Sequence, residues 1–355
     1  RAPRTARRRA RRGPAREVDP VSRVPNEPEP GALARPKRGV LRRWLPWACV
    51  LVTLLVGLFA PLIANDVPLI AKVDGAISFP AFADLVGEAP PGPHDLSWKQ
   101  WWSRLPYDGD DWAWMPLRPF GPLETSASRF YAAPSFLYPL GNDDTGRDVL
   151  ARIIHGARTA VILGLPAVLL AAMIGTLLGA WAALSRGLVD LVVQRLIELF
   201  LCFPTLLFLL FASAFFGSST VALVTVMVLR FWISFARIVR GEVLSLRERE
   251  YVLVARGLGL STWRILTRHI MPQLISAIGV TCAFCMAAAI VAESTLSFLG
   301  VGPSSQSSWG TMLRQGSEQA ALGVWHLWLF PAAAIIAVVV SCHVLADRLR
   351  SEPAM

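Results

Sequence analysis

The chain has 355 residues, of which 54% are hydrophobic and only 17% are charged, and its formal net charge is +10. A typical soluble domain carries roughly 25% charged residues, so the composition indicates a membrane protein. The positive charge could suit a nucleic-acid-binding protein, but it is confined to residues 1–43, which hold 13 Arg and one Lys against four acidic residues. The remaining residues are neutral overall, so no nucleic-acid partner is expected.

The chain begins with an arm at residues 1–43 that is rich in Arg and Pro, which predicts disorder. The first apolar run follows at residues 44–64 and contains no charged residue. No small-residue cleavage site follows this run, so we expect a retained membrane-spanning helix and no cleaved signal peptide. Because basic residues beside a span favour the cytoplasm, the arm is predicted to be cytoplasmic and to contact anionic lipid.

Five further apolar segments are long enough to cross a bilayer of about 30 Å as helices. We expect them between Arg158 and Arg186, and at about residues 193–216, 219–239, 274–292 and 324–346. The prediction is an all-α membrane protein with six transmembrane helices, the last five of which form a core at residues 158–346. Six spans return the tail at residues 347–355 to the cytoplasm, together with the Arg-rich connection between the fourth and fifth spans.

Residues 65–157 are predicted to lie outside as an enlarged insertion with 12 acidic and seven basic residues. Trp98, Trp101, Trp102 and Leu105 recur at the spacing of one helix face. Since Trp favours the membrane–water boundary, one interpretation is an interfacial helix or a cap over the outer mouth. The other interpretation is a small packed subdomain with Trp in its core, and the sequence does not separate the two.

The sequence contains no catalytic constellation. Its five His are scattered, and motifs for phosphate binding, nucleophilic catalysis and zinc proteolysis are absent. Cys282 and Cys285 have redox or zinc spacing but no second Cys/His pair, so they are interpreted as small apolar residues. We expect a non-catalytic chain that binds neither a metal nor a nucleotide.

The cytoplasmic connection at residues 248–272 is the most informative segment. Its pattern predicts two short helices with a break at Gly259. Ser261 or Thr262 can cap the second helix, and Pro272 marks the start of the next span.

The second of these helices is predicted to be amphipathic. Trp263, Leu266 and Ile270 should share one side, with Arg264 and Arg268 off that face. Such a helix fits a groove on a soluble partner, and it fits the lipid surface equally well.

This segment resembles the coupling loop of ABC-importer permeases, whose pattern is Glu-Ala-Ala, three residues, Gly, nine residues and Ile-x-Leu-Pro. The pattern falls on Leu253, Val254, Ala255, Gly259, His269, Met271 and Pro272. Ala255, Gly259 and Pro272 match strictly, whereas Leu253 replaces the family's Glu. The resemblance implies that contacts with a partner ATPase are made by Val254, Ala255, Gly259, Trp263, Arg264, Arg268 and Pro272.

Residues 140–158 resemble the segment before the second span in the peptide/nickel branch of these permeases. The matching motif consists of Gly141, Asp143, Asp144, Gly146, Arg147 and Asp148. Its charged members are interpreted as helix-capping and loop-ordering groups in preference to substrate contacts. Residues 239–251 and 292–302 also fit this branch, so the resemblance covers about residues 40–346. The start of the insertion, at residues 64–80, resembles the microcin-C/oligopeptide subgroup.

The resemblance implies the permease subunit of an ATP-driven importer of peptides or peptide-like solutes in a bacterial inner membrane. It also implies a second permease subunit, two ATP-binding subunits that hold ATP and Mg, and a periplasmic or lipid-anchored substrate-binding protein. Two other classes stay open from the residues alone. One is an ion-coupled secondary transporter, and the other is a membrane-anchored receptor that uses the outer segment.

Arg230 lies near the centre of the predicted fourth span, where a charge costs at least about 2.5–3.5 kcal/mol. It can face a transport pathway and meet acidic or peptide-carboxylate groups, or pair with Glu198 or Glu293. A third interpretation is that its side chain snorkels or that the helix frame is shifted. Glu293, near the outer end of the fifth span, can line an outer gate or lie at the interface. Arg195 and Glu198 have the spacing of a local ion pair.

Overall fold

The computed structural model describes residues 40–86, 92–105, 110–126, 129–185, 187–303 and 307–351. The predicted disordered arm lies outside these residues except for the start of the first helix, and residues 352–355 of the predicted tail also lie outside. The chain divides into two units, Arg1–Val40 and Leu41–Met355. The second unit contains the fold and is described by itself.

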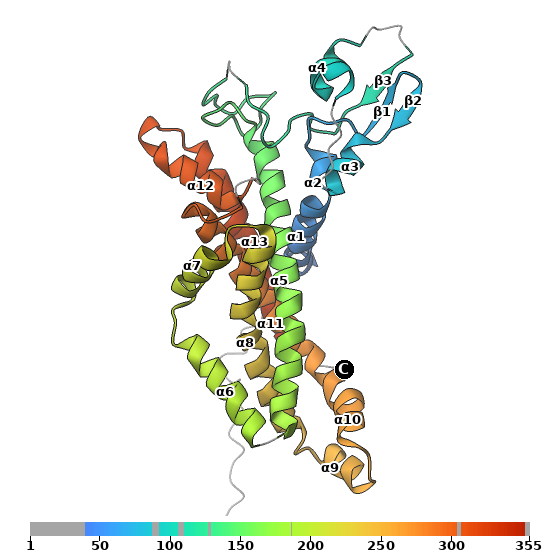
Figure 1. Cartoon of the computed structure of the whole chain (residues 1–355), viewed down its shortest axis with the longest axis vertical. Helices are drawn as coiled ribbons and strands as arrows, with labels where there is room; N and C mark the ends of the chain where they lie inside the picture. The colour runs from blue at the N-terminus through green and yellow to red at the C-terminus, as the bar shows by residue number, and fades with distance from the viewer. Residues whose placement is uncertain are drawn as a thin grey trace, which may run out of the picture. The chain divides into compact units, whose positions relative to one another are not determined.

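In the described part of the chain, four helices are long and apolar enough to cross a membrane. They are α5 (Val149–Ser185), α8 (Thr220–Leu246), α11 (Met271–Phe298) and α13 (His326–Ser351). The most extensive helix contact joins α5 and α8, which run side by side (Figure 1). Gly175 and Gly179 of α5 face the backbone of α8 at Trp232 and Ala236, so the two helices approach closely because no side chain separates them.

The second span begins earlier than hydropathy predicts. Its predicted limits are Arg158 and Arg186, whereas α5 begins at Val149. The carboxylate of Asp148 explains this start, because it accepts the backbone N–H groups of Leu150 at 3.4 Å and of Ala151 at 3.3 Å. Helices α8, α11 and α13 lie where the fourth, fifth and sixth spans are predicted, and each extends further at its C-terminal end.

The prediction of a continuous third span at residues 193–216 is wrong. This segment forms α6 (Leu188–Leu201) and α7 (Thr205–Phe216), which meet at an angle of 93°. Pro204 explains the break, because it has no N–H to donate and its ring disfavours helical geometry at the preceding Phe203. The predicted turn at Gly217 then separates α7 from α8.

The first predicted span, at residues 44–64, is also divided. It forms α1 (Val40–Leu58), which contains Pro46, and the single turn α2 (Ala60–Ile63). The apolar stretch Leu45–Leu58 is shorter than a full crossing helix. Among the described residues there are thus four full-length candidates, or five with the bent pair, instead of six. The prediction of an all-α membrane protein is confirmed.

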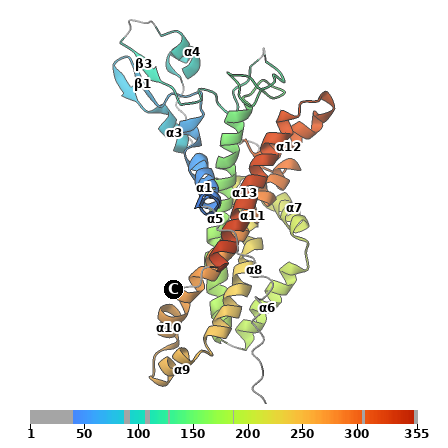
Figure 2. The same cartoon turned by 180° about the vertical axis from the view of Figure 1, so that it is seen from behind.

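A small sheet in the predicted insertion is the exception to the helical class. Strand β1 (Ile70–Val73) pairs antiparallel with β2 (Ala76–Ser78) and β3 (Trp112–Trp114), in the order β2-β1-β3. The helices of this segment are α3 (Pro80–Val86), η1 (Pro93–Asp95) and α4 (Trp98–Ser103). Within the second unit, Figures 1 and 2 show the sheet at the end opposite to α9 (Glu250–Gly257) and α10 (Thr262–Ile265).

Two Trp of α4 lie in the core of this small subdomain. Trp98 and Trp101 are 8% and 6% exposed, and their rings meet edge to face with centroids 5.9 Å apart. Both pack with Val67 and Ala71, whereas Trp102 is exposed. Because protein encloses the rings of Trp98 and Trp101, the structure favours the packed subdomain over the interfacial helix as the interpretation of this segment.

Three short elements complete the unit. The π-helical turn η2 (Leu266–Ile270) joins α10 to α11. Helix α12 (Trp309–Glu318) and the 3-10 turn η3 (Ala320–Leu322) lead from α11 to α13.

Candidate functional site

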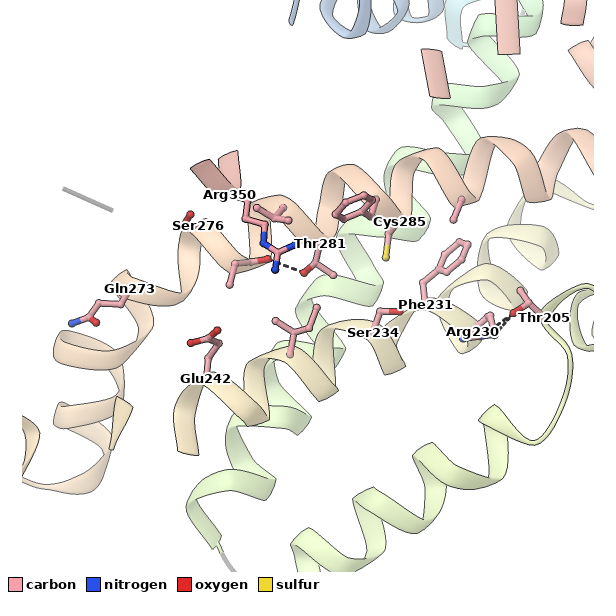
Figure 3. A pocket seen from close by; sticks show the side chains of 15 residues that line it. Thr205, Arg230, Phe231, Ser234, Glu242, Gln273, Ser276, Thr281, Cys285 and Arg350 are labelled. Atoms are coloured by element: carbon pink, nitrogen blue, oxygen red, sulfur yellow. Dashed lines mark hydrogen bonds between the residues drawn. The ribbon is translucent and has the colours of Figure 1, made fainter. Parts of the chain in front are cut away.

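A cavity of about 780 Å³ lies between α8 and α11 (Figure 3). Thr205 at the start of α7 and Arg350 near the end of α13 contribute to its wall. The wall mixes apolar side chains, such as those of Phe231 and Phe284, with hydroxyl and charged groups. This composition suits a solute that carries both apolar and polar groups.

Arg230 of α8 lines this cavity, and its side chain points towards Thr205 (Figure 3). Its Nε and Nη2 atoms donate to Thr205 Oγ1 at 3.1 and 2.7 Å. The break before α7 places this hydroxyl beside α8, so Thr205 is a site residue that hydropathy misses. The Phe203–Pro204 pair was the available sequence signal, because proline interrupts a helix.

The alternative ion pairs of Arg230 are not formed. Glu198 accepts from its neighbour Arg195 at 2.6 Å, which confirms the predicted local pair. Glu293 is 2% exposed and accepts from the hydroxyls of Ser297 at 2.7 Å and Ser294 at 3.3 Å. Glu293 therefore lies neither at an exposed interface nor on the wall of this cavity.

The connection at residues 248–272 folds as the sequence predicts. Helix α9 ends at Gly257, and Gly259 takes a φ of 78°, a conformation that favours glycine. Ser261 then caps α10 by accepting from the N–H of Arg264 at 3.4 Å. Pro272 lies in the first turn of α11.

The two sides of this connection differ in burial. One side joins a shared core with α5, α8 and α11, and its members include Val252, Ala255, Ile265, Leu266 and Ile270. The predicted face of Trp263, Leu266 and Ile270 is therefore divided, since Trp263 is 69% exposed while the other two are buried. Ala255 is also buried, so it supports the loop from within instead of offering a contact.

The exposed side of the connection carries four large apolar side chains. Leu253, Val254, Leu258 and Trp263 are 50%, 62%, 78% and 69% exposed. Leu258 is missing from the predicted set, although its position just before the Gly259 break was a usable signal. Arg264, Arg268 and Pro272 are exposed as well. This apolar surface, which we call the coupling surface, comprises Leu253, Val254, Leu258 and Trp263.

The aspartate–arginine motif before α5 forms a buried network. Asp143 accepts from the Nε of Arg147 at 2.7 Å, from the Nη1 of Arg152, and from the backbone N–H of Thr145 at 2.9 Å. Burial on its own raises the pKa of Asp143, but the charges of Arg152 and Arg147 and the backbone donors outweigh it and lower the pKa. This carboxyl is therefore held ionised.

The rest of the motif orders the same loop. Gly141 and Gly146 have φ of 81° and 78°, backbone angles that residues with a side chain rarely adopt. Asp144 contacts Arg147 at 3.4 Å, and Asp148 accepts from Arg118 at 2.8 Å besides capping α5. The motif thus performs the capping and loop ordering that the residues predict.

The long apolar helices and the bent pair define a multi-pass membrane protein, and a cavity lies between two of these helices. Residues 175–351 match the family described as binding-protein-dependent transport system inner membrane component. The chain belongs to this family, and the predicted membership among importer permeases is confirmed.

Similar proteins support this assignment. A protein of Brucella suis biovar 1 that is named as a peptide permease is 35% identical over 240 residues, which cover 67% of this chain and 78% of that protein. The dipeptide transport system permease protein DppC of Bacillus subtilis is 34% identical over 235 residues, which cover 66% of this chain and 73% of that protein.

Proposed function

We propose that this chain is the membrane-spanning subunit of an ATP-driven importer of peptides or peptide-like solutes. The observation that carries the proposal is the coupling surface, which is exposed and apolar while the opposite side of the same two helices is buried against α5, α8 and α11. Exposed apolar patches on a soluble-facing loop mark contact sites for another protein. The names of the two relatives support the peptide class.

In this proposal the chain carries out no covalent chemistry. ATP and Mg bind to two partner subunits, and closure of that pair displaces the α9–α10 connection as a rigid body. Because Val252 and Ile265 share a core with Val243 of α8 and Leu274 of α11, the displacement passes directly to the spanning helices. ATP then favours one of two transporter states through its different contacts with each.

The remaining partners follow from topology. In this proposal the chain lies in a bacterial inner membrane, with the basic connection and both termini on the cytoplasmic side, as basic residues beside a span favour. A second permease subunit would complete the transport pathway beside the α8–α11 cavity. A periplasmic or lipid-anchored substrate-binding protein would deliver solute to the outer side, where the insertion with the β1–β3 sheet lies.

The two rival classes predict different features. An ion-coupled carrier uses a broken helix with an ion site near the membrane centre. In this chain the break at Pro204 presents the hydroxyl of Thr205 to the cationic Arg230, which disfavours a cation there. A receptor without transport would have no use for an apolar coupling surface on the cytoplasmic side.

The test is a double substitution in the coupling surface, Leu258→Asp with Trp263→Asp, in the chain co-expressed with its transport partners. Both side chains are largely exposed, so we expect normal yield and an unchanged melting temperature, with loss of the co-purifying ATPase subunits. Leu322→Asp is the matched control, because Leu322 is 62% exposed in η3, far along the chain from the connection. Full retention of the ATPase by the double variant would contradict the proposal.

A further inference from the structure

The cavity between α8 and α11 has an uneven distribution of charge. One stripe of α8 faces it, with Arg230, Ser234, Ile238 and Glu242 spaced four residues apart. Figure 3 shows Arg230 and Thr205 together in one part of the cavity and Glu242, with Arg350, in the other part. The described residues of the wall include two arginines and one glutamate, so their formal charge is positive.

The guanidinium of Arg230 has capacity for another ligand. A guanidinium carries five N–H donors in a planar fork. Among the described residues, the hydrogen bonds of Arg230 go from Nε and Nη2 to one neutral oxygen, Thr205 Oγ1. Neither candidate carboxylate approaches it, because Glu198 pairs with Arg195 and Glu293 is held by serines. Nη1 makes no hydrogen bond to the described residues, and the side chain lines the cavity, so this end of the fork can take a ligand from it.

The orientation of this arginine is fixed from one side. Thr205 lies in the first turn of α7, directly after the Pro204 break, so its hydroxyl is held by a rigid helix start. Two donors on one hydroxyl keep the guanidinium plane in place without neutralising its charge. A planar anion such as a carboxylate suits the exposed end of a fixed guanidinium, because two parallel N–H···O bonds can form.

We propose that Arg230 is a specificity-determining residue that binds the carboxylate of the transported solute, supplied by the free C-terminus of a peptide or by an acidic side chain. This proposal rests on the proposed importer function and refines it. Apolar groups such as Phe231 and Phe284 border the same cavity and can accept the side chains of a peptide. Mixed walls of this kind tolerate varied side chains while one charged group fixes orientation.

The experiment measures initial uptake rates in proteoliposomes that contain the complete importer and its substrate-binding protein. Three probes are compared: trialanine with a free C-terminus, the same peptide amidated, and an amidated Ala-Glu-Ala peptide. Each rate is divided by the wild-type rate for the same probe, which removes the selectivity of the binding protein. For Arg230→Gln we expect uptake of free trialanine to fall about tenfold, since hydrogen bonds to charged groups are the strong ones.

Uptake of amidated trialanine should change much less in Arg230→Gln, and Arg230→Lys should recover part of the loss for free trialanine. Amidated Ala-Glu-Ala distinguishes the two carboxylate sources: a fall with this probe as well extends the role of Arg230 to side-chain carboxylates, and unchanged uptake restricts it to the C-terminus. Arg237→Gln is the matched control, because Arg237 is on the same helix with an exposed side chain outside the cavity.

Thr205→Val provides a second variant that keeps the charge and removes the hydroxyl that orients it. We expect uptake of free trialanine to fall more than uptake of amidated trialanine, as in Arg230→Gln but by a smaller factor. This variant tests the proposal if Arg230→Gln fails to assemble. Equal effects on free and amidated trialanine, or no effect on either, would overturn the role of Arg230 while leaving the importer function standing. Absence of peptide uptake by the wild-type complex would instead overturn the proposed function.

Discussion

Arg152 and Arg230 both occupy long membrane-spanning helices, yet their surroundings differ. Arg152, at the start of α5, is 4% exposed and donates to the carboxylate of Asp143 and to the hydroxyl of Ser307. Arg230, in the middle of α8, is only partly buried and has the hydroxyl of Thr205 as its partner. The charge of Arg152 is therefore neutralised within the chain, whereas that of Arg230 is not.

This difference separates an arginine that stabilises the fold from one that is available to a ligand. A buried charge with a buried counter-charge forms a unit, and removing one member leaves the other without compensation. A charge on the wall of a cavity is accessible to water or solute, so it can be retained without a counter-charge in the fold. Stability should therefore respond strongly to the Asp143 network, and transport should respond to Arg230.

The largest expected effect is that of Asp143→Ala. This change leaves the nearly buried Arg152 and the adjacent Arg147 without their shared carboxylate. Removing one partner of a buried ion pair costs about 3–5 kcal/mol, so we expect a large fall in the melting temperature of the purified protein in detergent, with a lower yield.

Asp144→Ala is the matched control for that change. The side chain of Asp144 is 30% exposed and contacts Arg147 at 3.4 Å, so its loss should cost about 0.5 kcal/mol or less. Equal losses for the two variants would show that the network does not depend on the central carboxylate. The contrast between Arg152 and Arg230 would then lose its energetic basis.

Arg240→Ala is expected to have an intermediate effect. Arg240 of α8 donates from Nε and Nη2 to the two carboxylate oxygens of Asp190, at 2.6 and 2.7 Å, and so links α8 to the first turn of α6. Both side chains are about a quarter exposed, at 27% and 26%, so we expect a loss of about 1 kcal/mol. The change should appear as faster hydrogen exchange in Leu188–Leu201.

The control for this prediction is Arg237→Ala, which removes an exposed arginine one turn earlier on α8. It should leave exchange in α6 unchanged. If exchange also stays unchanged in Arg240→Ala, the bidentate pair does not hold α6, and the position of the bent pair depends on apolar packing alone.

Much of the fold can be predicted from the sequence, because hydropathy and turn residues act locally. The spans that became α8, α11 and α13, the break at Gly259 and the cap at Ser261 all depend on neighbouring residues. The bent pair is different, since the predicted span at residues 193–216 has its charged residues only near its start, at Arg195 and Glu198, and stays uncharged across the break. The break comes from the backbone restriction of Pro204. Because proline kinks some helices and ends others, the sequence alone does not tell which of the two occurs.

The candidate site is harder to predict because its partners are distant in sequence. Arg230 is an obvious anomaly in an apolar span, but its partner Thr205 becomes a neighbour only through the break before α7. In the same way, the exposure of Leu258 and the burial of Ala255 depend on how α9 packs against α5, α8 and α11. A periodic pattern gives the faces of a helix, but not which face the rest of the chain covers.

The smallest expected effect is that of Arg195→Ala, which removes the ion pair with Glu198 on α6. The atoms are 2.6 Å apart, which is shorter than the 3.4 Å contact of Asp144, yet the side chains are 70% and 58% exposed. Outside lipid, solvent screens such a pair and its formation restricts two flexible side chains, so we expect a change of about 0–0.5 kcal/mol in thermal unfolding. A loss comparable to that of Asp143→Ala would mean that Arg195 is enclosed by a partner subunit. Burial, and not distance, should therefore rank these arginines by their contribution to stability.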